Sequence, residues 1–209
     1  MKRLRFVITA GPTREHLDPV RFLSNPSTGK MGFAIARAAA ARGHGVTLVA
    51  GPVALKTPKG AKRIDVTSAR EMLAAVEGEL GPGAILIATA AVADWRPAKC
   101  AAKKLKKGGM SGVLKLVRNP DILKTVKGVM KIGFAAETND VIAEARRKCR
   151  EKNLEMIVAN DVTEKGSGFG TDTNRVAFVK KDGAVERLPL MTKLAVARRI
   201  VRECEGLRP

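Results

Sequence analysis

The chain alternates short apolar runs with longer segments in which apolar residues recur every three or four positions. Residues 4–9 form the first apolar run, and Gly11 and Pro12 close it, which predicts a buried strand and its turn. Residues 33–42 carry an alanine-rich helical pattern, and residues 46–50 form the next apolar run. A strand, a glycine loop, a helix and a second strand at this spacing predict a βαβ unit with a parallel sheet.

The alternation continues along most of the chain. Further strands are expected at residues 62–66, 84–89, 130–135 and 155–159, with an edge strand at 113–117. Further helices are expected at residues 67–80, 139–152 and 191–203, with a short one after Pro120. Thr67 or Ser68 would cap the first of these helices, and Glu71 is spaced for a capping box.

The last apolar runs predict a β-hairpin, because residues 176–179 and 184–188 flank the turn signal Asp182-Gly183. We therefore expect one α/β domain over residues 1–209. Its sheet should be Rossmann-like, doubly wound and mostly parallel, with helices on both faces and a β-hairpin appendage at about 174–189.

The segment from about residue 96 to 112 breaks the alternation. It is rich in lysine and glycine, shows no period, and contains the run Lys103-Lys104-Leu105-Lys106-Lys107. We expect a flexible surface flap here. Its lysines are either a solvated charge run or a group that closes over a polyphosphate ligand and neutralises its charge.

Composition limits the class of protein. A hydrophobic fraction of 45% in 209 residues can build a core, and the sequence has no apolar run of the ~18–20 residues that a membrane span needs. No signal peptide is recognised at the start, so we expect a cytoplasmic protein. Three cysteines without metal-ligand spacing are expected to be reduced thiols.

The chain carries 39 Lys and Arg against 20 Asp and Glu, a formal net charge of +19. Such a charge is compatible with nucleic-acid binding. Aromatic residues make up only 3% and tyrosine is absent, so side chains that could stack on bases are scarce. A basic nucleic-acid-binding protein therefore stays a weaker alternative.

Residues 21–32 contain the strongest candidate chemistry. This polar, glycine-bearing loop runs directly into the first helical pattern, and a helix N-terminus attracts phosphate. Side-chain hydrogen-bond donors are added to this loop by Asn25, Ser27, Thr28 and Lys30. The loop therefore predicts an anion site for a phosphorylated ligand.

Ligands of doubly wound sheets bind beyond the carboxyl ends of the strands. Those ends should lie at Gly11, at residues 90–94, at residues 134–138 and at residues 160–161. Asp94 is there the candidate carboxylate for a metal or a ligand hydroxyl, with a turn or helix cap as the plain alternative.

A nicotinamide-dependent reductase is the main alternative from the residues alone, because a glycine loop before a helix is part of the dinucleotide signature. Two features weigh against it. The second strand ends at Val49-Ala50-Gly51 without an acidic residue for a ribose, and no tyrosine is available as a catalytic acid. Met31 after Gly29-Lys30 also excludes a Walker loop.

Several sequence motifs, in order along nearly the whole chain, resemble phosphopantothenate–cysteine ligase (phosphopantothenoylcysteine synthetase) of coenzyme A biosynthesis. They are Gly11-Pro12-Thr13-Arg14-Glu15, Leu17-Asp18-Pro19-Val20-Arg21, Ser24-Asn25, Ser27-Thr28-Gly29-Lys30-Met31-Gly32, Ala90-Ala91-Val92-Ala93-Asp94, Lys104-Leu105-Lys106-Lys107, Asn119-Pro120-Asp121-Ile122-Leu123, Gly133-Phe134-Ala135-Ala136-Glu137-Thr138 and Ala159-Asn160-Asp161-Val162.

The resemblance implies a two-step ligation. The carboxylate of 4′-phosphopantothenate attacks the α-phosphate of CTP, or less expectedly ATP, and pyrophosphate leaves. The amine of L-cysteine then attacks the acyl-nucleotide and releases the nucleoside monophosphate. Mg²⁺ is implied as the metal, with Asp94 as its candidate ligand.

The resemblance also implies which residues form the site. The implied nucleotide contacts are Gly11, Ser27, Gly29, Gly32, Ala88, Thr89, Ala90, Asp94, Lys104, Arg118, Asn119, Pro120, Asp121, Phe134, Lys148, Lys152 and Asn160. The implied contacts to phosphopantothenate are Arg21, Asn25, Ala90, Ala91 and Asp94. Asn25 is expected to steady the acyl-nucleotide as an oxyanion donor, and Lys104 to neutralise charge in the first step.

The resemblance finally implies a homodimer, in which Arg21 reaches the neighbouring subunit's site and the hairpin near residues 176–188 is a candidate dimer element. Many bacterial relatives carry a fused flavin-dependent decarboxylase. None is recognised in this sequence. We therefore expect either a separate phosphopantothenoylcysteine decarboxylase as the pathway partner, or a sequence that is one piece of a longer protein.

Overall fold

The computed structural model describes residues 3–106, 112–137, 140–161, 163–164 and 166–207. Its centre is an eight-stranded sheet in the order β13-β12-β10-β9-β6-β1-β4-β5. The strands are β1 (Arg5–Ala10), β4 (Gly45–Ala50), β5 (Ala61–Asp65), β6 (Ala84–Ala88), β9 (Met130–Glu137), β10 (Met156–Asp161), β12 (Ala177–Lys180) and β13 (Val185–Arg187). The six strands from β10 to β5 pair in parallel, and β12 and β13 pair antiparallel at one edge.

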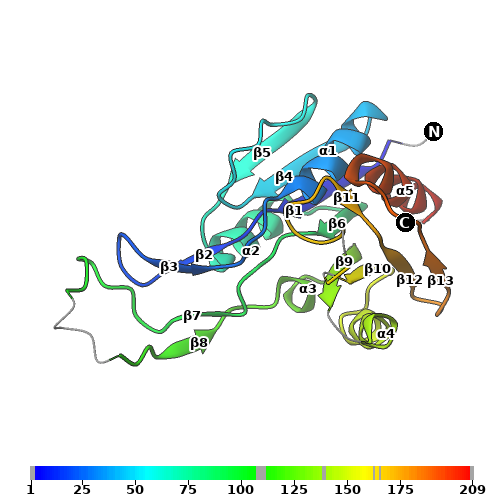
Figure 1. Ribbon diagram of the computed structural model, residues 1–209. Helices are drawn as coiled ribbons and strands as arrows, with labels where there is room; N and C mark the ends of the chain where they lie inside the picture. The colour runs from blue at the N-terminus through cyan, green and yellow to red at the C-terminus, as the bar shows by residue number, and fades with distance from the viewer. Residues whose placement is uncertain (1–2, 107–111, 138–139, 162, 165, 208–209) are drawn as a thin grey trace.

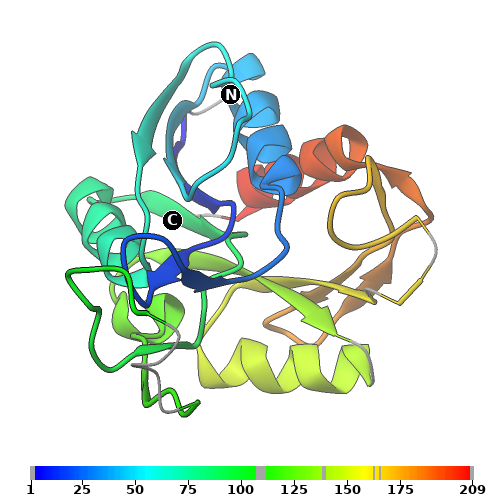
Figure 2. The same ribbon diagram turned by 60° about the vertical axis from the view of Figure 1, so that its left-hand side comes forward.

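Helices cover both faces of the sheet, as Figures 1 and 2 show. They are α1 (Lys30–Ala41), α2 (Ala69–Glu79), α3 (Ile122–Thr125), α4 (Val141–Glu151) and α5 (Lys193–Gly206). Successive residues of a strand point to opposite faces. Phe6 and Ile8 of β1 therefore pack with α1 and α5, whereas Val7 packs with α2, α3 and α4.

The strand order reverses direction beside β1. The chain winds outward through β4 and β5 on one side of it, and through β6, β9 and β10 on the other. The predicted doubly wound, mostly parallel α/β fold is therefore confirmed. The predicted cap of α2 is present as well, because Ser68 Oγ accepts the Glu71 N–H at 3.3 Å and Glu71 Oε2 accepts the Thr67 N–H at 2.7 Å.

The predicted edge strand at residues 113–117 is wrong. The chain forms β8 (Leu116–Arg118) instead, which pairs antiparallel with β7 (Trp95–Pro97) outside the main sheet. A second unpredicted hairpin, β2 (Arg14–His16) with β3 (Phe22–Ser24), lies beside it. We call residues 14–24, 95–106 and 112–118 the arm, which projects from the body in Figure 1. Residues 107–111 of the expected flap lie outside the described part of the chain.

The hairpin at about 174–189 extends the sheet and is not a separate appendage, because β12 pairs with β10. Its residues Val176, Phe178 and Val179 are buried in the two cores. The short strands β11 (Thr173–Asn174) and β14 (Met191–Thr192) pair beside it and lead into α5. In the described part of the chain, no helix has the length and apolar character needed to cross a bilayer.

Candidate active site

A cavity of about 710 Å³ opens at the carboxyl ends of β1, β6, β9 and β10, where a ligand was expected. This volume is in the range of small-molecule sites. The cavity gathers most of the predicted site residues, from segments far apart in the sequence. Those that line it are Asn25, Ser27, Gly29, Gly32, Ala88, Thr89, Ala90, Ala91, Asp94, Arg118, Asn119, Pro120, Asp121, Phe134, Lys148, Lys152 and Asn160.

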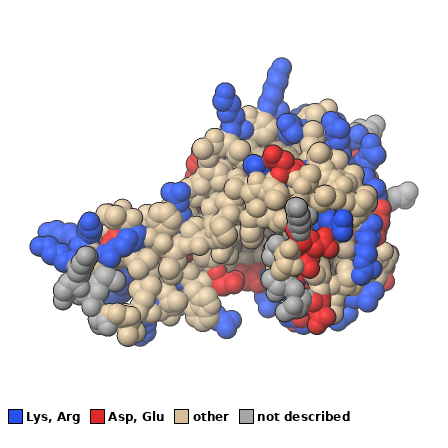
Figure 3. Space-filling view, in the orientation of Figure 1, with Lys and Arg blue, Asp and Glu red and all other residues tan. Residues whose placement is uncertain are grey.

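Three predicted site residues do not line the cavity: Gly11, Arg21 and Lys104. Gly11 lies directly behind the loop, because a Cβ placed on Gly29 would meet the Gly11 nitrogen at 3.3 Å. Arg21 and the exposed Lys104 belong to the arm. Figure 3 shows Lys and Arg side chains gathered at the end of that arm, away from the body.

The predicted phosphate loop ends at the N-terminus of α1, which begins at Lys30, three residues earlier than the apolar pattern indicated. Gly29 takes the N-cap position with φ 76°, a left-handed conformation that glycine adopts without strain. No side chain caps the helix and no acidic residue stands in its first turn. The first N–H groups of α1 are therefore left for another acceptor, and an anion suits that position.

Gly32 has a packing role that the sequence did not reveal. A Cβ at this position would lie 2.5 Å from Ala10 Cβ and 2.5 Å from Thr89 Oγ1. Glycine therefore lets the first turn of α1 approach the ends of β1 and β6 closely. That close approach places the phosphate loop beside the segment at residues 88–91.

Two residues expected to hold the acyl substrate touch each other. Asn25 Nδ2 donates to the carbonyl oxygen of Ala91 at 3.0 Å. The Ala90 N–H in turn donates to Thr9 Oγ1 at 3.2 Å, which fixes the turn after β6. An exposed amide side chain thus lies at the point where the loop and this turn meet.

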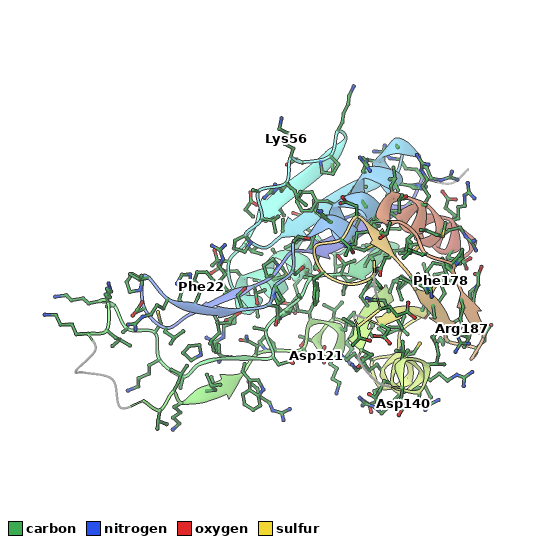
Figure 4. The ribbon with its side chains drawn as sticks, in the orientation of Figure 1. Phe22, Lys56, Asp121, Asp140, Phe178 and Arg187 are labelled. Carbon is green, nitrogen blue, oxygen red and sulfur yellow. The ribbon has the colours of Figure 1, made fainter. Side chains whose placement is uncertain are left out.

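Lys148 of α4 and Lys152, the C-cap of that helix, line the cavity, although a lysine on a charged helix is usually a surface residue. Lys152 Nζ lies 3.0 Å from Asp121 Oδ2, and Lys148 pairs with Glu137. Asp121 also caps α3 by accepting the Lys124 N–H at 3.2 Å. Figure 4 shows Asp121 at the start of α3, between the arm and α4.

Asp94 is exposed and lines the cavity, and its backbone carbonyl accepts the Asn119 N–H at 2.8 Å. Among the described residues, no three His, Cys, Asp or Glu side chains gather as a ready-made metal site. Mg²⁺ is commonly bound by one or two carboxylates together with substrate phosphates. Asp94, the predicted metal ligand, and Asp121 both present a carboxylate at the cavity wall, where a ligand's phosphate oxygens would also lie.

Sequence reasoning missed one wall of the cavity, which is formed by the loop between β10 and β11 and by the start of α5. Gly168, Phe169, Asn174 and Lys193 line it. A signal was present in the sequence, because Lys193 directly follows the helix cap Thr192. A cation in the first turn of a helix is unfavourable because it opposes the helix dipole, so such a lysine indicates a compensating interaction elsewhere.

Comparisons with known proteins identify the family. Residues 1–207 match the family described as DNA/pantothenate metabolism flavoprotein C-terminal domain, and the chain belongs to it. The coenzyme A biosynthesis bifunctional protein CoaBC of Escherichia coli (strain K12) is 48% identical over 220 residues, covering 100% of this chain and 54% of the relative. CoaBC of Bacillus subtilis (strain 168) is 50% identical over 208 residues, covering 96% and 51%.

Solved structures agree with the fold. The crystal structure of the C-terminal domain of CoaBC superposes with a TM-score of 0.84 at 44% identity, covering 99% of this chain and 96% of that one. A Cab2 mutant in complex with phosphopantothenate-cysteine superposes with a TM-score of 0.79 at 17% identity, covering 97% and 85%, and this likeness concerns the fold alone. The chain spans about half the length of the curated relatives it matches.

Proposed function

We propose that this chain is a phosphopantothenate–cysteine ligase, which joins 4′-phosphopantothenate and L-cysteine into 4′-phosphopantothenoylcysteine. The observation that carries the proposal is the convergence of the family's motif residues on one cavity at the carboxyl ends of the parallel strands. The relatives at 48% and 50% identity, which are coenzyme A biosynthesis proteins, support the same substrate class. The reductase and nucleic-acid alternatives lack comparable support.

The first step transfers a nucleotidyl group. The pantothenate carboxylate oxygen bonds to the α-phosphorus of CTP, and the bond from that phosphorus to the bridging oxygen breaks and releases pyrophosphate. The free N–H groups at the start of α1, together with Lys148 and Lys152, suit a multiply charged ligand. Mg²⁺, held by phosphate oxygens with Asp94, would supply further charge neutralisation when bound.

The second step forms the amide. The cysteine amine attacks the acyl carbon, CMP leaves with the former carboxylate oxygen, and the amine loses a proton. Asn25 Nδ2 already donates to a carbonyl oxygen, that of Ala91, and in the reaction it would donate to the oxyanion on the acyl carbon. Lys104 lies on the arm and does not line the cavity of its own subunit. Its contribution to the first step would therefore require the arm segment to approach this cavity or that of a neighbouring subunit.

We further propose a homodimer built through the arm. Eight large hydrophobic side chains of the described residues are exposed, and six of them belong to the arm: Val20, Phe22, Trp95, Val113, Leu114 and Leu116. Such a cluster is typical of a surface that a partner covers. The hairpin of β12 and β13 buries apolar residues inside the subunit, and its expected part in the dimer stays a prediction. A separate decarboxylase as pathway partner stays a prediction.

The deciding experiment is a nucleotide panel. Pyrophosphate release is measured with 4′-phosphopantothenate, Mg²⁺ and each of CTP, ATP, GTP and UTP, with and without L-cysteine. We expect turnover with CTP above all, and amide product only when cysteine is present. Absence of turnover with every nucleotide would contradict the ligase, and ATP turnover alone would contradict the CTP preference.

A further inference from the structure

Two lysines stand at the first positions of two different helices, and both reach the same loop. Lys30 begins α1 and Lys193 begins α5. Lys30 Nζ donates to the Gly170 carbonyl at 2.8 Å, and Lys193 Nζ donates to the carbonyls of Gly168 at 3.0 Å and Thr171 at 2.6 Å. Both lysines line the cavity.

The two lysines place more positive charge beside this loop than the stability of the fold needs. A cation at a helix N-terminus opposes the helix dipole, and here two such helix ends and two ammonium groups face one loop. Lys193 is only 7% exposed, and no carboxylate of the described residues lies within ion-pair distance of it. Its burial, and then the charge of Lys30, lower the pKa of Lys193.

The carboxylate that pairs with Lys30 can be displaced by a stronger anion. Asp172 Oδ1 lies 2.8 Å from Lys30 Nζ, and its side chain is 88% exposed. An exposed ion pair of this kind contributes little to stability, so a multiply charged anion in the cavity can compete with Asp172 for Lys30. Lys193 has an unused donor, because an ammonium group has three N–H bonds and two of them meet carbonyls.

We propose that Lys30 and Lys193 form a polyphosphate subsite at the end of the cavity closed by the loop at residues 166–172. That its natural ligand is the pyrophosphate portion of the nucleotide, and later the leaving pyrophosphate, rests on the proposed function. The subsite itself requires only that the cavity accepts a small polyanion. Binding exchanges the contact between Lys30 and Asp172 for one between Lys30 and a phosphate oxygen.

Lys131 offers a matched control. It is also buried, at 4% exposure, and its Nζ donates to two carbonyls, those of Leu123 at 2.7 Å and Val126 at 3.3 Å. Its pKa is likewise lowered by burial. Lys131 does not line the cavity, so its role is to hold the end of α3. If Lys193 only holds its loop in place, its substitution should have the same effects on stability and on binding as substitution of Lys131.

The test is calorimetric titration of inorganic pyrophosphate with Mg²⁺ into the whole chain at constant salt. Lys193→Met and Lys30→Met should each weaken binding about tenfold, the loss expected for one charge-assisted hydrogen bond. Lys131→Met should keep the wild-type affinity while its melting temperature falls about as far as that of Lys193→Met. Equal pyrophosphate affinity in Lys193→Met and Lys131→Met would overturn the proposal.

A second variant keeps the test valid if Lys193→Met does not fold. Asp172→Asn retains both lysines and removes the competing carboxylate, so it should bind pyrophosphate several times more tightly. Unchanged or weaker binding would overturn the proposed exchange. Pyrophosphate titration needs no ligase turnover, so its outcome is independent of the nucleotide panel. Binding can confirm the subsite even if the panel shows no activity, and absent binding can refute it even if the panel shows activity.

Discussion

At the scale of single residues, Asn25 and Lys193 show what a sequence does and does not reveal. Asn25 belongs to a run of short motifs whose order is specific, so its place in the cavity was predictable. Lys193 belongs to no motif. Its importance depends on the packing of α5 against the loop after β10. These contacts join residues 22 and 25 positions apart, which a local pattern does not encode.

Asn25→Ala is predicted to separate the two chemical steps. Pyrophosphate release in the absence of cysteine should stay within a few-fold of wild type, because the first step draws on the cationic groups of the cavity. Amide formation should fall by about 10²–10³, the usual loss when one oxyanion donor is removed. Single-turnover measurement of pyrophosphate and of the amide product checks this. The control is Asn153→Gly, at a position that does not line the cavity and whose φ of 49° suits glycine. Equal loss in both steps would remove the assigned role.

At the scale of elements, the long apolar runs were predictable and the arm was not. The strands of the main sheet follow from short apolar runs, and four helices follow from a period of three to four residues. The pairs β2–β3 and β7–β8 have only three residues per strand, too few for a period to show. The two pairs are also joined across a large sequence separation, because the Ala101 N–H after β7 donates to the Leu17 carbonyl after β2 at 2.8 Å, and a local pattern does not show such a contact.

Two glycines should respond in opposite ways to alanine, because they lie in different surroundings. Gly32→Ala should destabilise by about 1–3 kcal/mol and weaken nucleotide binding, since the new methyl group would force the first turn of α1 away from β1 and β6. Gly78→Ala in α2 meets open space and should stabilise by about 0.5–1 kcal/mol through helix propensity. Denaturant unfolding of both variants measures the difference. If Gly32→Ala leaves the free energy of unfolding unchanged, the close approach of α1 to β1 and β6 is not needed for stability.

At the scale of the whole molecule, the arm ties the predicted substrate residue Arg21 to the segment that carries Lys104. The buried carboxylate of Asp18 accepts the Leu105 N–H at 3.1 Å and the Arg21 Nε at 3.0 Å. Arg21 Nη2 also donates to the Leu105 carbonyl at 2.8 Å. The Arg21 guanidinium holds the pKa of Asp18 well below its usual value, so this ion pair should persist into acidic solution, where an unpaired aspartate is already protonated. These contacts hold Arg21 beside Leu105, the residue that directly follows Lys104.

If the arm delivers Arg21 to a neighbouring subunit, two inactive variants should restore each other. Arg21→Ala subunits keep Asn25 in their own cavity, and Asn25→Ala subunits supply an intact Arg21. Random pairing after co-refolding gives about half heterodimers, each with one complete site, so amide formation should recover to about a quarter of wild type. The measurement is steady-state product formation against the mixing ratio, with each variant alone as baseline. Activity that stays at the average of the two variants would place Arg21 in its own subunit's chemistry, since complementation requires the residue to act across the interface.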